Sequence, residues 1–99
     1  MAMKKGTSER ILADVPEDKV FWCYGSETFK NLHELAAALE HMSEEAFQYH
    51  VTKHKNDFSN WARDVIGDTT LASQLRKAPT KSAAASKAKA RIAWLKARI

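Results

Sequence analysis

Residues 49–68, with the sequence YHVTKHKNDFSNWARDVIGD, contain one complete helix and the signals that begin and end it. Asp57 is predicted to be the N-cap of this helix, because a short carboxylate accepts hydrogen bonds from free backbone N–H groups. Gly67 is predicted to end it in a left-handed conformation, and Asp68 to cap the next helix. The apolar residues that share one face at helical spacing are Phe58, Trp61, Ala62 and Val65. The block therefore predicts a helix that buries Trp61.

Two helices are predicted before this block. Asn31 is expected to cap the first, with Glu34 three residues later as in a capping box. Ser43 is expected to cap the second, whose first turn carries Glu44 and Glu45, where the helix dipole favours acids. The predicted buried residues are Leu32, Leu35, Ala36, Leu39 and Met42 in the first helix, and Ala46, Phe47 and Val51 in the second.

Two more helices are predicted after the block. The helix that follows Asp68 is expected to bury Leu71, Ala72 and Leu75 and to end before Pro79. Thr80 is expected to cap a last helix, whose second half is predicted to dock while its polar first half frays. Its predicted contact line consists of Ala85, Ala88, Ile92, Leu95 and Ile99.

The N-terminal part is predicted to be less regular. Residues 1–18 have no sustained apolar period, so we expect a flexible leader. Residues 20–24, VFWCY, read as a strand that ends at the Gly25-Ser26 turn, and residues 28–30 as a very short second strand. The predicted fold class is mostly α with a small N-terminal β-hairpin (α+β), a compact bundle of four to five short helices. The domain is expected over residues 19–78, followed by a basic Ala/Lys-rich C-terminal helix over residues 79–99.

Length and composition exclude several classes of protein. A chain of 99 residues is one domain, and a single cysteine, Cys23, allows no internal disulfide. No apolar run has the length of a signal peptide or a membrane span, so we expect a cytoplasmic protein. The three glycines stand apart, which leaves a glycine-rich phosphate loop unsupported. No cofactor is predicted.

The net charge of +4 is unevenly distributed. Residues 11–50 contain eight acids and two bases, whereas residues 76–99 contain eight bases and no acid. The basicity of the protein is therefore a property of its C-terminal segment.

This basic segment has three possible partners. It resembles in composition the lysine- and alanine-rich tails that neutralise nucleic-acid phosphates without reading sequence. The possible nucleic-acid contacts are Lys81, Lys87, Lys89, Arg91, Lys96 and Arg98. Alternatively, the segment complements the acidic stretch of residues 34–45 in the same molecule, or it meets an acidic protein or membrane surface. A helix-turn-helix over residues 31–51 is disfavoured, because its second helix begins with two glutamates.

The sequence contains residue types that a metal site or a nucleophilic active site would require. His50 and His54 are four apart, the spacing of zinc-binding pairs on a helix, but they lack further ligands nearby and are only weak metal candidates. His50 is more simply read as a hydrogen-bonding residue at the domain surface or beside Trp61. Cys23 lies in an apolar strand, where a thiol is usually a small hydrophobic residue rather than a nucleophile. No catalytic residue is predicted.

The polar residues of the central block form the predicted interaction patch. Its members are His50, His54, Asn60, Arg63 and Asp64. The structural alternative is that Arg63 or Asp64 pairs with a neighbouring helix. These residues would then serve the fold rather than a partner.

Several segments together resemble one family. The runs FWCYGSETFKN, LHELAAALEHMSEEAFQYHV, KNDFSNWARDVIGD and LASQLRKA are similar to the uncharacterised DUF5752 family, small helical domains of archaea and bacteria. The resemblance covers roughly residues 19–78, and ARIAWLK near the end shows a weaker similarity. The connector KAPTKSAAASKAKA departs from the family pattern, in which this region is more acidic. The resemblance implies a discrete module to which no reaction or ligand is assigned.

These observations together predict a non-catalytic interaction or adaptor module whose partner is most simply another protein. The alternative is a sequence-independent nucleic-acid-binding protein that acts through the basic C-terminal segment. An uncharacterised enzyme is the least supported class.

Overall fold

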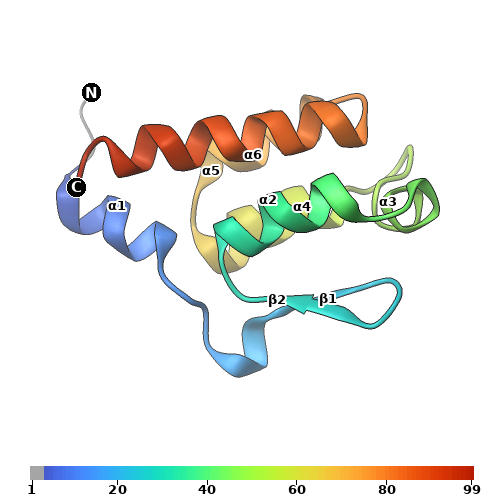
Figure 1. Ribbon diagram of the computed structural model, residues 1–99, viewed down its shortest axis with the longest axis horizontal. Helices are drawn as coiled ribbons and strands as arrows, with labels where there is room; N and C mark the ends of the chain where they lie inside the picture. Colours follow the sequence, from blue (N-terminus) through green and yellow to red (C-terminus); the bar gives the residue numbers. More distant parts are fainter. Residues whose placement is uncertain (1–3) are drawn as a thin grey trace.

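The computed structural model describes residues 4–99. The elements in this range are α1 (Lys5–Leu12), η1 (Glu17–Lys19), β1 (Phe21–Cys23), β2 (Glu27–Phe29), α2 (Leu32–His41), α3 (Glu44–His50), α4 (Asp57–Trp61), η2 (Ala62–Ile66), α5 (Thr69–Lys77) and α6 (Lys81–Lys96). Helix α2 lies between α6 on one side and the hairpin on the other (Figure 1). The predicted fold class, mostly helical with a small N-terminal hairpin, is confirmed.

The hairpin forms as predicted, with a first strand that is one residue shorter at each end and a second strand that is shifted by one residue. β1 and β2 pair antiparallel, and Phe21 lies opposite Phe29. Gly25 and Ser26 make the turn with φ values of 96° and 76°, a left-handed conformation that glycine adopts without strain. Phe21, Cys23 and Phe29 are all less than 10% exposed, so one face of the hairpin belongs to the core.

The helix of the central block receives this face of the hairpin. Phe58 stacks on Phe21 with ring centroids 5.1 Å apart, and Trp61 meets Phe29 edge-on at 5.5 Å. The indole Nε1 of Trp61 donates a hydrogen bond of 2.9 Å to the carbonyl of Lys19, which fixes η1 beside the hairpin. The predicted burial of Phe58, Trp61 and Ala62 is therefore confirmed, while Val65 is only half-buried.

Most of the predicted helix caps are present. The side chains of Asn31, Ser43, Asp68 and Thr80 each accept a hydrogen bond from the backbone N–H three residues later. The prediction for Asp57 is wrong, because Asn56 occupies the N-cap position and accepts from the N–H of Ser59. An Asn-Asp pair offers two competent caps in succession, and the sequence pattern does not decide between them.

Gly67 ends the helical run of the central block as predicted. The residue has φ 86°, and the N–H groups of Gly67 and Asp68 both donate to the carbonyl of Ala62 at 2.9 Å. The wide last turn, η2, is a π-helix that leads into this C-terminal cap. Asp68 then caps α5 directly, so only Gly67 and Asp68 separate the two helical segments.

Helices α6 and α2 pack side by side (Figure 1). Ala84 and Ala88 are 3% and 0% exposed, so the first half of α6 is docked as well as the second. The prediction that this half frays is wrong. Alanine contributes little hydrophobic area, but its small side chain allows two helices to approach closely and to bury their backbones against each other. Ile99, at the end of the predicted contact line, is 52% exposed.

The sequence indicated no helix before residue 18, yet Lys5–Leu12 forms α1 beside the C-terminal end of α6 (Figure 1). Ile11 is 4% exposed and joins the core. A helix of eight residues is marginal alone, so contact with α6 stabilises it rather than its own propensity. One buried isoleucine does not make a periodic pattern, which explains why the sequence did not reveal it.

Candidate functional site

His50 is a buried polar residue of the central block with two hydrogen-bond partners. It lies at the end of α3 in the core, 4% exposed, with its ring 5.0 Å from that of Phe21. Its Nε2 accepts a hydrogen bond of 2.9 Å from the backbone N–H of Tyr24, and its Nδ1 donates one of 2.9 Å to Asp57. A nitrogen that accepts from an amide carries no proton, so the ring is neutral with its hydrogen on Nδ1. His50 therefore joins the hairpin to α4 and does not belong to a surface patch.

The predicted histidine pair does not form. Helix α3 ends at His50, and His54 lies in the exposed loop that follows, so the two side chains do not share a helix face. Both ring nitrogens of His50 are already bonded within the protein. In residues 4–99 no group of three or more His, Cys, Asp or Glu side chains is arranged to hold a metal ion.

Cys23 has the surroundings of a structural thiol. Its side chain is 6% exposed, on the inner face of β1. Burial raises the pKa of the thiol, and the negative charge of Glu27 raises it further. The thiol therefore stays protonated near neutral pH. His50 could not act as its base, because Nε2 is occupied by the amide of Tyr24.

The remaining predicted patch residues divide into two groups. His54 and Asn60 line the same hollow beside the loop of residues 51–56. Arg63 and Asp64 are exposed, do not line this hollow and pair with each other at 2.8 Å, so the alternative that one of them pairs with a neighbouring helix is wrong. The guanidinium of Arg63 lowers the pKa of Asp64. The five residues of the predicted patch therefore do not form one surface.

Arg91 is not available to a nucleic acid. Its side chain is 8% exposed and donates two hydrogen bonds to the carboxylate of Asp68, at 2.7 and 3.0 Å. The same guanidinium lies over the ring of Trp94, 4.5 Å from its centroid. The prediction that Arg91 contacts phosphates is wrong, because a charge count along the sequence does not distinguish an inward-facing arginine from an exposed one.

Two more of the predicted contacts are engaged within the protein. Lys89 forms an ion pair of 2.7 Å with Glu40 of α2, which lowers the pKa of Glu40. Arg98 lies 3.5 Å from the ring centroid of Trp94 and donates to its carbonyl. The Lys89–Glu40 pair is the kind of contact that an intramolecular role for the basic segment requires.

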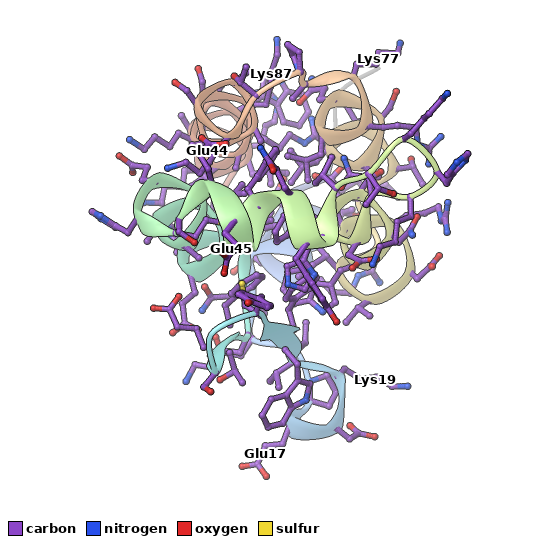
Figure 2. The ribbon with its side chains drawn as sticks, turned by 90° about the vertical axis from the view of Figure 1, so that its right-hand side faces the viewer. Glu17, Lys19, Glu44, Glu45, Lys77 and Lys87 are labelled. Atoms are coloured by element: carbon purple, nitrogen blue, oxygen red, sulfur yellow. The ribbon has the colours of Figure 1, made fainter. Side chains whose placement is uncertain are left out.

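Lys81, Lys87 and Lys96 form no ion pair within residues 4–99. Lys87 and Lys96 are exposed, and Lys81 is half-buried at the start of α6. Figure 2 shows Lys87 and Lys77 at the end of the molecule away from the hairpin. Of the six predicted nucleic-acid contacts, these three keep their charge free.

Three large aromatic side chains, carried by the hairpin and by α3, are exposed. Trp22, Tyr24 and Tyr49 are 74%, 45% and 57% exposed, and we call them the aromatic surface. Strand alternation directs Trp22 outward while Phe21 and Cys23 point into the core. Tyr24 follows β1 in the turn, and its ring lies against α3. Sequence reasoning missed this surface, although the alternation in FWCY was the signal that could have revealed it.

The aromatic surface is held in place by neighbouring groups. The ring of Tyr24 lies 4.9 Å from that of Tyr49, and its hydroxyl donates a hydrogen bond of 2.9 Å to Glu45. This hydrogen bond raises the pKa of the Tyr24 phenol. Lys55 lies over the ring of Tyr49, 5.3 Å from its centroid. The two tyrosines are therefore positioned before any partner arrives.

One carboxylate contacts the aromatic surface. Glu45 projects from α3 toward the hairpin in Figure 2, and Glu44 lies on the side nearer to α6. Glu27 lies at the start of β2, opposite Cys23. The negative charge at these rings therefore comes from Glu45, while Lys55 brings a positive charge to Tyr49.

No family model matches the chain, and neither the curated proteins nor the solved structures contain a match. Among the described residues, no helix has both the length and the apolar character needed to cross a bilayer.

Proposed function

We propose that this chain is a non-catalytic interaction module that binds a partner protein through the aromatic surface. The observation that carries the proposal is Trp22, which is 74% exposed on a strand whose other face lies in the core. A tryptophan left in water on a fixed backbone has a large apolar area to bury against a partner.

The chemistry of this surface supports the proposal. Tryptophan and tyrosine dominate the residues that contribute most to protein–protein binding. The rings of Tyr24 and Tyr49 lie in contact at a tilt of 35°, so binding would cost little additional side-chain entropy. A short hairpin that is anchored on Phe58 and Trp61 presents Trp22 on a supported backbone, and α3 carries Tyr49.

The charge around the aromatic surface supports a partner that carries lysine or arginine. Glu45 accepts a hydrogen bond from Tyr24, and residues 11–50, which include all three rings, contain eight acids and two bases. Guanidinium and ammonium groups bind both to carboxylates and to the faces of aromatic rings. A basic peptide or protein surface therefore fits this site better than an acidic one.

Two further observations favour binding over catalysis. The thiol of Cys23 is buried with a raised pKa, and the Nε2 of His50 is used by a backbone amide. The resemblance to the DUF5752 family agrees with a small module of this type and assigns it no reaction. Membership of that family is part of the proposal.

A peptide-display selection on the full chain tests the proposal. We expect enriched peptides to contain more lysine and arginine than the input library. They should fail to bind the Trp22→Thr variant, in which threonine preserves the strand, and they should retain binding to Ile99→Thr, which removes an exposed apolar side chain elsewhere. If no peptide is enriched, or if the enriched peptides bind both variants equally well, the proposal is wrong.

Nucleic-acid binding through the basic C-terminal segment is the second candidate. The observation that favours it is the set of free charges on Lys81, Lys87 and Lys96, to which α1 adds Lys5 and Arg10 beside the end of α6. Truncation after Lys77 would remove Ile92 and Leu95 from the core, so the test requires charge substitutions in the full chain.

The triple variant Lys81→Gln, Lys87→Gln and Lys96→Gln provides this test. If the second candidate holds, the wild-type protein raises the fluorescence anisotropy of a labelled duplex at low salt, and the triple variant lowers both the affinity and its salt dependence. Equal binding by the two proteins, or no binding at low salt, rejects the candidate.

A further inference from the structure

The loop between α3 and α4 forms a closed turn. Val51 pairs with Asn56, and the N–H of Thr52 donates to the carbonyl of Lys55 at 2.9 Å. The hydroxyl of Thr52 also accepts from the N–H groups of His54 and Lys55, both at 3.2 Å. These bonds fix the backbone that carries three consecutive basic side chains, Lys53, His54 and Lys55.

A hollow of about 360 Å³ lies between this turn, α4 and the end of α5. Among the described residues, the charged side chains that line it are all basic. They are Lys53, Lys55 and Arg76, together with the titratable His54. Asn60 of α4 adds an amide that can donate hydrogen bonds. The hollow therefore combines positive charge with donors from three separate parts of the chain.

The carboxylate of Asp57, which follows this loop in the sequence, is bonded to His50 and Lys55. Its Oδ2 accepts hydrogen bonds from His50 at 2.9 Å and from Lys55 at 3.0 Å, and Asp57 is not among the residues that line the hollow. Arg76 forms no ion pair within residues 4–99. One lysine is thus partly neutralised, while Lys53 and Arg76 keep their full charge.

We propose that this hollow binds a phosphate group through Arg76, Lys53 and Asn60. Arginine presents a planar pair of N–H groups that matches two oxygens of one phosphate, and lysine adds a point charge. A partly open hollow of this kind is expected to bind free phosphate weakly, with a dissociation constant on the order of 1 mM. The site uses none of the residues of the aromatic surface, so it goes beyond the interaction proposed above.

The test is a titration followed by the backbone amide signals of the full-length, isotope-labelled protein at constant ionic strength. Three probes are compared: inorganic phosphate, phenyl phosphate as a monoester, and glutarate as a carboxylate of similar charge. Saturable shifts at Lys53, His54 and Asn60 with either phosphate probe support the site. Preference for inorganic phosphate indicates a free anion, and preference for phenyl phosphate indicates an esterified group.

Arg76→Gln and Lys53→Gln should each weaken phosphate binding about fivefold or more, because each removes a charged hydrogen bond. Arg63→Gln is the matched control, since Arg63 is equally a surface arginine but lies outside the hollow. If Arg63→Gln weakens binding as much as Arg76→Gln, the interaction is nonspecific and the proposal is wrong. Equal affinity for glutarate, or shifts that never saturate with phosphate, also overturns it.

Discussion

Arg91 and Asp68 form a buried ion pair in which one carboxylate serves two purposes. Asp68 accepts the N–H of Leu71 as the cap of α5 and receives two hydrogen bonds from Arg91 of α6. Both side chains are less than 10% exposed. The pair therefore ties the start of α5 to the middle of α6.

Replacing Arg91 with methionine should destabilise the protein by about 3 kcal/mol, because it leaves the charge of Asp68 buried without a partner. Urea denaturation followed by circular dichroism measures the free energy of unfolding. Lys87→Met is the control, since Lys87 is exposed and unpaired within the described residues. Equal stability of the two variants would show that the pair contributes little.

His50→Ala should cost about 2–3 kcal/mol, because it removes a buried ring and leaves the N–H of Tyr24 and the carboxylate of Asp57 without their partner. The hydrogen-exchange rate of the Tyr24 amide should rise by more than the lower free energy of global unfolding alone would cause. His54→Ala alters an exposed loop residue and should leave both measurements unchanged. Slow exchange at Tyr24 in His50→Ala would contradict this account.

Ala88→Leu tests the packing of the first half of α6 on α2. Ala88 is 0% exposed, so three additional carbons should overpack the contact and destabilise the protein by about 1–3 kcal/mol. Ala90→Leu is the matched control, because Ala90 is exposed on the same helix and leucine is also a good helix former. If the first half of α6 were frayed, the two variants would have the same melting temperature.

Cys23 should react slowly with iodoacetamide at pH 8, because burial raises the pKa of its thiol and limits access. The rate should rise in urea to that of a small free thiol. A native rate equal to the rate in urea would contradict the burial of this residue.

The same pKa shift has a consequence for stability. A thiol whose pKa is higher in the folded protein than in the unfolded chain holds its proton longer when folded. Its contribution is complete below the pKa of the unfolded thiol, about 8.5, and is lost as the pH rises through the folded value. The Cys23→Ala variant should therefore lose less stability than the wild-type protein between pH 8 and pH 10, measured by urea denaturation.

The sequence predicted the elements of the fold better than their contacts. Asn31, Ser43, Thr80 and Gly67 carry local signals, because caps and left-handed positions depend on only a few neighbouring residues. Helix α1 and the docked first half of α6 depend on tertiary contact, and their polar or alanine-rich sequences give no apolar period.

The candidate sites depend on burial, side-chain partners and helix packing, which the pattern of residues along the sequence does not reveal. His50 and Arg91 looked exposed because they are polar, yet each is buried with specific partners. The strand prediction for residues 20–24 assigned no exposed face, and strand alternation directs Trp22 into solvent. The convergence of His54, Asn60 and Arg76 on one hollow follows from the packing of three elements.

The proposed role of the aromatic surface is tested most directly by the affinity of one display-selected basic peptide for three full-length proteins: wild type, Trp22→Thr and Ile99→Thr. Isothermal titration calorimetry should give a dissociation constant at least about tenfold higher for Trp22→Thr than for the other two, because a central tryptophan typically contributes 2 kcal/mol or more. The free energies of unfolding of the three proteins should agree within about 1 kcal/mol, since both substituted side chains are mostly exposed. Equal affinity of Trp22→Thr and wild type would contradict the account.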